Sequence, residues 1–182
     1  MRSMEAWHPP PSVPFARQVE TAPVGLFEAA TERFVVIDTE TTGLNAEARI
    51  IELAAAWVDV RKGEVTEVRS TLVDPGMRIP PAASAINGIY DRDVRGKPSI
   101  DRALTRFFAY LEDGPVVAHN ARYDVARLRF EANRTIACLP HRLPVYCSLK
   151  MARAALPARR SYKLDTLATE LELSREGIAH RA

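Results

Sequence analysis

Short apolar runs interrupted by turn residues mark three neighbouring strands in the first half of the chain. Residues 34–37 are apolar and end at Asp38, a pattern typical of a buried strand. Residues 49–60 predict a second strand, and the Lys62-Gly63 turn leads into a third at residues 64–73. In this third run apolar and polar side chains alternate, so we expect one buried face and one face in water.

The apolar spacing changes to a helical period after Pro98. Ser99 is a suitable N-cap, and the apolar residues of the segment 100–111 recur at helical spacing. Further along, the pattern predicts strands at 116–118 and 144–146, helices at 124–133, 149–156 and 164–173, and a short helical piece at 82–86. Three antiparallel strands followed by strands that alternate with helices indicate an α/β fold. We expect a mixed five-stranded sheet flanked by helices, the RNase H-like arrangement.

The composition indicates one folded domain behind a loose leader. The chain has 182 residues, and we place the domain at residues 25–182. Residues 1–24 hold five prolines and show no period, so we interpret them as the leader. No apolar run approaches the ~18 residues of a membrane helix and no signal peptide is visible, so we expect a cytoplasmic protein. Cys138 and Cys147 are too few for a disulfide framework or a zinc site.

Charge is unevenly distributed along the chain, whose net charge is only +2. Residues 122–182 contain 12 Lys and Arg against 6 Asp and Glu. A basic C-terminal third is suited to nucleic-acid phosphates, although a solvated surface in an arginine-rich chain would show the same excess.

Candidate chemistry begins where the first strand ends. Residues two apart in a strand point to the same side, so the carboxylates of Asp38 and Glu40 project together. Two like charges that lie close together both stay ionised only when cations share them. A cluster that offers only carboxylate oxygens suits Mg²⁺ or Mn²⁺ rather than zinc.

Three segments resemble the motifs of the DEDD-superfamily 3′–5′ exonucleases. The run from Asp38 to Leu44, Asp-Thr-Glu-Thr-Thr-Gly-Leu, is similar to the first motif as found in the proofreading epsilon subunit of bacterial DNA polymerase III. The run His-Asn-Ala-Arg-Tyr-Asp, ending at Asp124, resembles the second motif. His180 matches the histidine of the DEDDh subgroup, to which the RNase T family belongs. The aspartate that follows this histidine in the family would fall beyond Ala182, so we expect the last motif to be incomplete in the given sequence.

The resemblance implies a catalytic set and a metal centre. Asp38, Glu40 and Asp124 would hold two Mg²⁺ or Mn²⁺ ions, and His180 would be the general base. His119 is expected to orient or pack neighbouring groups rather than to catalyse. Asn120 and Asp165 are expected to have structural roles.

The resemblance also implies a pocket for the terminal nucleotide. Its residues would be Thr41, Thr42, Leu44, Ile86, Asn87, Gly88, Ile89 and Tyr123. Leu44 and Ile89 would wedge against the base. The backbone phosphates would meet basic side chains, namely Arg122, Arg127, Arg159, Arg160 and Lys163. The sequence departs from the family at Asn87, where the epsilon subunit has His, and at Cys147-Ser148, where relatives often have Asp-Thr or Asp-Ser.

Three functions are compatible with these residues. The first is hydrolysis of phosphodiester bonds at the 3′ end of DNA, with a DNA polymerase as a candidate partner. The second is the same chemistry on RNA, which the form of the first motif disfavours. The third is a catalytically impaired module that binds nucleic acid or a polymerase. Retention of all four residues of the catalytic set favours an enzyme.

Overall fold

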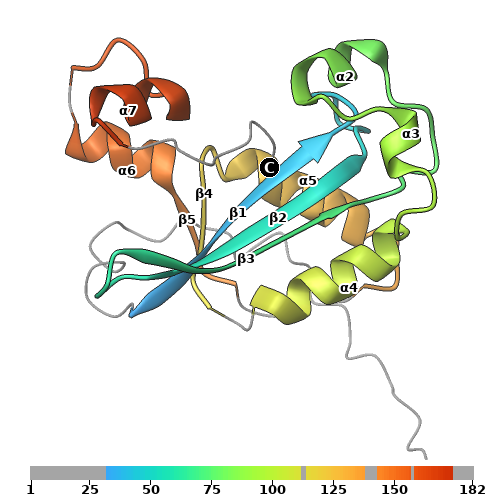
Figure 1. The fold of residues 1–182 in the computed structure, drawn as a ribbon, viewed down its shortest axis with the longest axis horizontal. Helices are drawn as coiled ribbons and strands as arrows, with labels where there is room; N and C mark the ends of the chain where they lie inside the picture. The colour runs from blue at the N-terminus through green and yellow to red at the C-terminus, as the bar shows by residue number, and fades with distance from the viewer. Residues whose placement is uncertain (1–31, 112–113, 138–142, 157, 174–182) are drawn as a thin grey trace, which may run out of the picture.

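The computed structural model describes residues 32–111, 114–137, 143–156 and 158–173 (Figure 1). The leader expected at residues 1–24 and the candidate base His180 lie outside these ranges. In the part that is described, no helix is long and apolar enough to cross a lipid bilayer.

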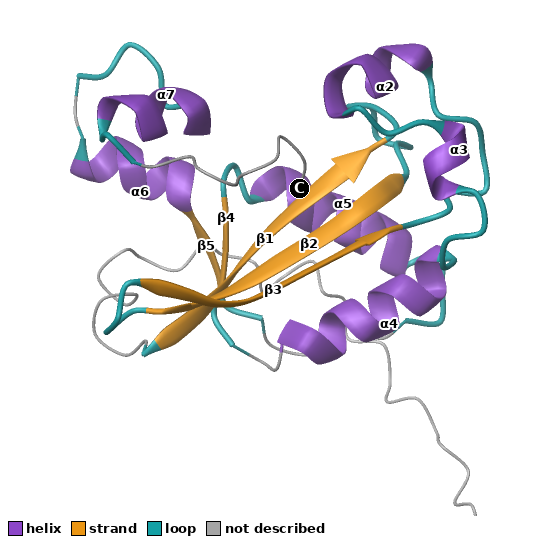
Figure 2. Ribbon diagram, in the orientation of Figure 1, coloured by secondary structure: helices purple, strands orange, loops and turns teal. Residues whose placement is uncertain are grey.

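The described residues form one mixed sheet of five strands (Figure 2). The strands are β1 (Arg33–Thr41), β2 (Ile50–Asp59), β3 (Glu64–Leu72), β4 (Val116–Ala118) and β5 (Val145–Cys147). They lie in the order β3-β2-β1-β4-β5. The pairs β1–β2 and β2–β3 are antiparallel, whereas β4 is parallel to both β1 and β5. This confirms the predicted fold class and puts β1, with its two acidic residues, at the centre of the sheet.

Helices follow the predicted order with small shifts at their ends. The described helices are α2 (Pro81–Asn87), α3 (Asp91–Val94), α4 (Ile100–Leu111), α5 (Arg122–Ala132), α6 (Ser148–Ala155) and α7 (Leu164–Glu170). The helix α5 starts two residues before the expected Asp124, because Asn120 adopts a left-handed φ of 65° and turns the chain straight from β4 into the helix. The helix α3 was not predicted, since four residues are too few to show a period.

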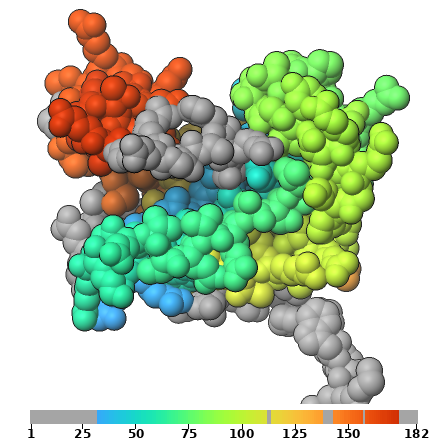
Figure 3. All heavy atoms as spheres, in the orientation of Figure 1, coloured from blue at the N-terminus to red at the C-terminus, as the bar shows by residue number. Residues whose placement is uncertain are grey.

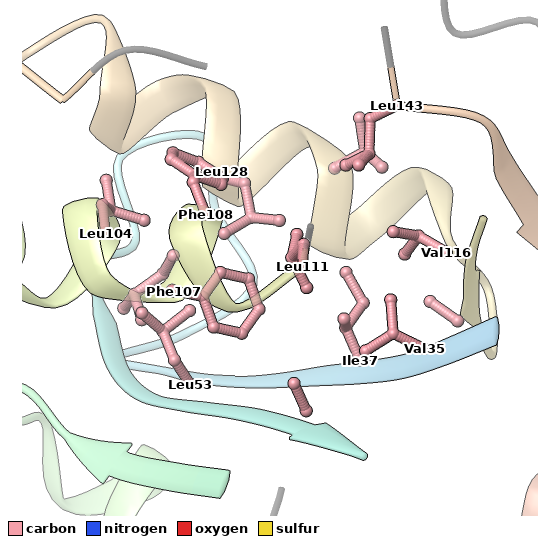
Figure 4. Packing of buried hydrophobic residues seen from close by; sticks show 14 of the residues in the cluster. Val35, Ile37, Leu53, Leu104, Phe107, Phe108, Leu111, Val116, Leu128 and Leu143 are labelled. Atoms are coloured by element: carbon pink, nitrogen blue, oxygen red, sulfur yellow. The ribbon is translucent and has the colours of Figure 1, made fainter. Parts of the chain in front are cut away.

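The main core lies between the sheet and the helices α4 and α5 (Figure 4). Val35 and Ile37 of β1 face Leu104 and Leu111 of α4 and Leu128 of α5, all at most 3% exposed. Burying a side chain of this kind contributes ~1.5–3 kcal/mol, so this layer holds β1 firmly against both helices. The predicted apolar face of α4 is confirmed.

The edge strand β3 differs from its predicted pattern. We expected one buried face, but Val65 is 60% exposed and Val68 is 65% exposed, and the polar residues between them are exposed as well. The first half of β3 extends beyond α4, as Figure 1 shows, so the core layer does not reach it. The prediction was wrong because alternation within a strand does not reveal whether a neighbouring layer covers it.

A second, smaller core fixes α2 and α3 beside the C-terminal end of β1 (Figure 1). It consists of Ile51, Ile79, Ala83, Ile89 and Val94. Ile51 comes from β2, so the region of α2 and α3 is anchored to the sheet independently of α4 and α5.

Candidate active site

Alternation along β1 sends its two acidic side chains away from the main core. Val35, Ile37 and Thr39 are buried on the core side, whereas Asp38 is exposed and Glu40 is half-buried. The two carboxylates therefore share one side of the strand, as the sequence predicted. In the space-filling view, α6 and α7 form one prominence and α2 and α3 another (Figure 3).

A hydrogen bond joins the first acidic segment to the second. The hydroxyl Oγ1 of Thr39 donates to Oδ1 of Asp124 over 2.8 Å, and 85 residues separate the two in sequence. Asp124 lies in the first turn of α5 and is 3% exposed. Because β4 is parallel to β1 and leads directly into α5, the start of this helix is carried to the end of β1.

Burial and repulsion raise the pKa values of the acidic groups. The pKa of Glu40 is raised to about 7, first by loss of hydration and then by the negative charges of Asp38, Glu52 and Asp124. Burial also raises the pKa of Asp124 to about 7, against the opposing effect of the Thr39 hydrogen bond. Loss of hydration raises the pKa of Asp38 as well, although its side chain still contacts solvent. These groups repel one another, and a nearby cation would relieve that repulsion.

Sequence reasoning missed Glu52. It lies directly opposite Glu40 in the β1–β2 pairing, and it is 6% exposed. Its signal was present, since it is the one acidic residue among the otherwise apolar residues 50–58 of β2. Its charge contributes to the raised pKa of Glu40.

The chemistry of the acidic residues fits a hard divalent cation, but their geometry is not preformed. Asp38, Glu40 and Asp124 offer carboxylate oxygens, the ligands that Mg²⁺ and Mn²⁺ prefer. Within the described ranges, however, no three His, Cys, Asp or Glu side chains stand close enough together to hold a metal ion. Side-chain rotation would be needed to bring the three carboxylates onto a common ion.

His119 has a packing role, in agreement with the sequence prediction. Its Nε2 lies 2.9 Å from the carbonyl oxygen of Tyr162, which can only accept, so Nε2 carries the proton. Its Nδ1 lies 3.0 Å from the hydroxyl of Ser148, which donates to it when the ring is neutral. His119 thus ties the end of β4 to α6 and to the segment before α7. His180, the expected base, lies outside the described residues.

Thr41, Thr42 and Tyr123 serve the loop that follows β1. Thr41 is 7% exposed and Thr42 is 6% exposed. The hydroxyl oxygens of Thr41 and Tyr123 are 2.6 Å apart, and the Tyr123 hydroxyl donates to the carbonyl of Gly43 over 2.8 Å. These hydrogen bonds hold the loop. The expected contact of the three residues with a nucleotide stays a prediction.

Two of the expected wedge and pocket residues point inward. Ile89 is 0% exposed in the second core, so the prediction that it wedges against a base is wrong. Asn87 is 5% exposed, and its amide donates to the carbonyl of Thr41 over 3.2 Å, so it braces α2 against β1. Gly88 ends α2 with a left-handed φ of 71°. The accessible apolar side chains are Leu44, 84% exposed, and Ile86, 83% exposed.

The basic residues divide into two groups. Arg127 is 8% exposed and donates to backbone carbonyls, so its expected contact with phosphate is wrong. Arg159 pairs with Glu170 over 2.9 Å. Arg122, Arg160 and Lys163 are exposed and remain available to an anion.

Comparison with known proteins places the chain in a family. A sequence model of the exonuclease family of RNase T matches residues 35–182. The DNA polymerase III subunit epsilon of Aquifex aeolicus is 35% identical over 150 residues, which are 82% of this chain and 72% of that protein. The PolC-type DNA polymerase III of Clostridium perfringens is 33% identical over 159 residues, but the match spans only 10% of its length.

A solved structure of exonuclease X in complex with 5′ overhanging duplex DNA has the same fold. It is 32% identical, has a TM-score of 0.62, and is matched over 82% of this chain and 81% of its own. Enzymes of this family generally use divalent metal ions. Both the fold and the exonuclease class predicted from the sequence are confirmed, and the chain belongs to the exonuclease family that includes the DNA polymerase III epsilon subunits.

Proposed function

We propose that this protein removes nucleotides from the 3′ end of a DNA strand by metal-dependent hydrolysis. The observation that carries the proposal is the hydrogen bond from Thr39 to Asp124, which brings the first two exonuclease motifs together at the end of β1. The family resemblance implies that residues of these two motifs belong to one catalytic set. We also propose that residues 25–182 form the exonuclease domain and that the protein is located in the cytoplasm.

Hydrolysis adds water across the bond between phosphorus and the 3′ oxygen. When bound, two Mg²⁺ or Mn²⁺ ions would supply Lewis acidity that lowers the pKa of the attacking water and stabilises the leaving oxygen. Asp38, Glu40 and Asp124 would hold these ions. His180 would take the proton of the water as general base. The products are a nucleoside monophosphate and a strand shortened by one nucleotide.

Exposed side chains on both sides of the carboxylates provide the grip on the strand. Leu44 and Ile86 offer apolar surface to the terminal base, in place of the buried Ile89. Arg122, Arg160 and Lys163 would contact phosphates, a contribution that weakens as salt concentration rises. The loop conformation set by Thr41 and Thr42 and by Tyr123 would position the backbone for the terminal sugar.

DNA is the proposed substrate because the relatives are named as DNA polymerase subunits and the related exonuclease X was solved with duplex DNA. A DNA polymerase is the proposed partner on the same ground.

The test is a product analysis with strands labelled at the 5′ end. Single-stranded DNA, in Mg²⁺ or Mn²⁺, should shorten into a descending ladder with release of nucleoside monophosphates. Matched RNA should react more slowly, and EDTA should stop the reaction. Release of nucleotides from the 5′ end, or full activity in EDTA, would contradict the proposal. Faster hydrolysis of RNA than of DNA would show that RNA rather than DNA is the substrate.

A further inference from the structure

One face of α5 grips the loop that follows β1, residues 42–49. Tyr123, Arg127 and Glu131 are spaced four residues apart, so their side chains lie along the same side of the helix. Each of the three forms hydrogen bonds to the segment 41–50. The same helix carries Asp124, so the loop and this carboxylate are attached to one rigid element.

Arg127 makes the central contact of this grip. Its Nη1 lies 2.9 Å from the carbonyl oxygen of Asn45, 2.8 Å from that of Ala46 and 3.3 Å from that of Ala48. Because Nη1 has two N–H groups, the two shorter contacts are full hydrogen bonds and the third is a shared one. A single buried guanidinium thereby fixes three carbonyls of the loop.

Tyr123 and Glu131, one turn before and one turn after Arg127 on α5, hold the two ends of the loop. At its start, the Tyr123 hydroxyl donates to the carbonyl of Gly43 over 2.8 Å. At its end, the Glu131 carboxylate accepts from Nε of Arg49 over 2.7 Å and from the backbone N–H of Ile50 over 3.1 Å. Arg127 is therefore the α5 side chain that holds the middle of the loop. The loop also has internal hydrogen bonds, from the backbone N–H of Glu47 to Oδ1 of Asn45 and from that of Ala48 to the carbonyl of Asn45.

Packing alone does not account for an arginine at this position. Its side chain is 8% exposed, and a buried guanidinium loses hydration that only hydrogen bonds replace. An apolar side chain would fill the space without that cost. What arginine adds is the fixed position of the carbonyls, and the segment that they hold begins next to Leu44, which is 84% exposed beside the site.

We propose that Arg127 is a positioning residue for the exonuclease reaction. By locking the loop to α5 it keeps Leu44 at a fixed place relative to Asp38, Glu40 and Asp124, so that the surface proposed to bind the terminal base is already in place before the strand arrives. This inference rests on the proposed function. Arg127 touches neither substrate nor metal, and it acts through the loop.

The first experiment measures the loop without using catalysis. Amide hydrogen exchange of residues 43–48 is compared in the wild type, Arg127→Met, Arg127→Lys and Arg102→Met. Arg102 is exposed on α4, so its variant makes the same chemical change away from the loop. Exchange should accelerate in Arg127→Met, less in Arg127→Lys because an ammonium keeps donors for part of the carbonyls, and not at all in Arg102→Met.

The second experiment measures kinetics on a single-stranded DNA labelled at the 5′ end. A binding surface that has lost its order must regain it when the substrate binds, which weakens substrate binding. We expect KM to rise about tenfold in Arg127→Met, while kcat and the metal concentration for half-maximal rate stay close to wild type. The KM of Arg127→Lys should lie between those of the wild type and Arg127→Met, and the KM of Arg102→Met should equal that of the wild type.

A double variant tests whether Arg127 acts through Leu44. If it does, the fold increase in KM of the double variant Arg127→Met/Leu44→Ala should be smaller than the product of the fold increases of the two single variants. The reason is that, once Leu44 is removed, Arg127 has less to position. Independent effects that multiply would overturn the role assigned to the loop.

The outcomes separate this inference from the proposed function. Unchanged loop exchange in Arg127→Met overturns the grip itself, and faster exchange with an unchanged KM overturns the positioning role. An inactive wild type overturns the exonuclease proposal and with it the positioning role, while the exchange data still decide the grip. If Arg127→Met does not fold, Arg127→Lys provides the same comparisons at smaller amplitude.

Discussion

At the scale of single residues, the site is a set of acidic groups held together against their repulsion. Burial and mutual charge raise the pKa values of both Glu40 and Asp124 to about 7. In the proposed function this cost is offset when a divalent cation binds to the carboxylate oxygens. Removal of one charge should therefore harm activity without harming the fold.

Asp38→Ala tests this separation. Activity should fall below detection, because one of the three carboxylates proposed to hold the metal ions is gone. Thermal stability in EDTA should be unchanged or higher than in the wild type, because one repelling charge has been removed. A large loss of melting temperature would instead assign Asp38 a structural role.

Glu40→Gln should reveal the raised pKa as a dependence of stability on pH. A carboxyl with a higher pKa in the folded than in the unfolded protein binds its proton more tightly when folded, so it destabilises the fold as pH rises from 4.5 to about 7. Glutamine does not titrate. In EDTA, the melting temperature of the variant minus that of the wild type should therefore increase across this range and level off above it. A constant difference would contradict the shift.

His180→Ala should lower kcat by about two to four orders of magnitude, the usual contribution of general acid–base catalysis. Affinity for the metal should change little, since carboxylates rather than an imidazole are the expected ligands. If full activity persists at neutral pH, another group is the base.

At the scale of elements, α5 joins the sheet, the site and the neighbouring loop. Its apolar residues pack on β1, Asp124 accepts from Thr39, and Glu131 pairs with Arg49. The pair of Glu131 and Arg49 has an N···O distance of 2.7 Å, and so does the pair of Glu67 and Arg69 on β3. The two pairs differ in burial, since the Glu131 side chain is 0% exposed and that of Glu67 is 46% exposed.

This matched distance gives a prediction about stability. Glu131→Ala should lower the free energy of unfolding by ~3–5 kcal/mol, because it leaves the partly buried guanidinium of Arg49 and the backbone N–H of Ile50 without this acceptor. Glu67→Ala should cost ~0–1 kcal/mol, because water screens the exposed pair. Urea unfolding of both variants measures the two free-energy changes. Similar changes would show that burial does not determine how much these ion pairs contribute to stability.

At the scale of the whole molecule, metal binding and folding should be linked. A ligand that binds only the folded protein stabilises it by ~2.7 kcal/mol when its concentration is 100 times its dissociation constant. The melting temperature of the wild type should thus rise with Mn²⁺ concentration, and that of Asp38→Ala should not. Equal responses in the two proteins would show that the ion binds elsewhere.

The sequence alone determined the features that depend on local periodicity. Alternation along residues 33–41 placed Asp38 and Glu40 on one side of a strand, and the helical period placed the buried face of α4. The order of strands and helices also determined the mixed sheet. These features follow from the geometry of one element at a time, which the spacing of apolar residues encodes.

Only the tertiary structure decided which side chains of the loops and helix faces meet the site. Ile89 and Asn87 turned inward because α2 packs on β2 and β1, and Arg127 turned inward because the loop carbonyls lie beside α5. The contact of Thr39 with Asp124 likewise needed β4 to lie alongside β1. The partners in these contacts lie about 40 to 85 residues apart in the chain, and no local spacing encodes such a separation.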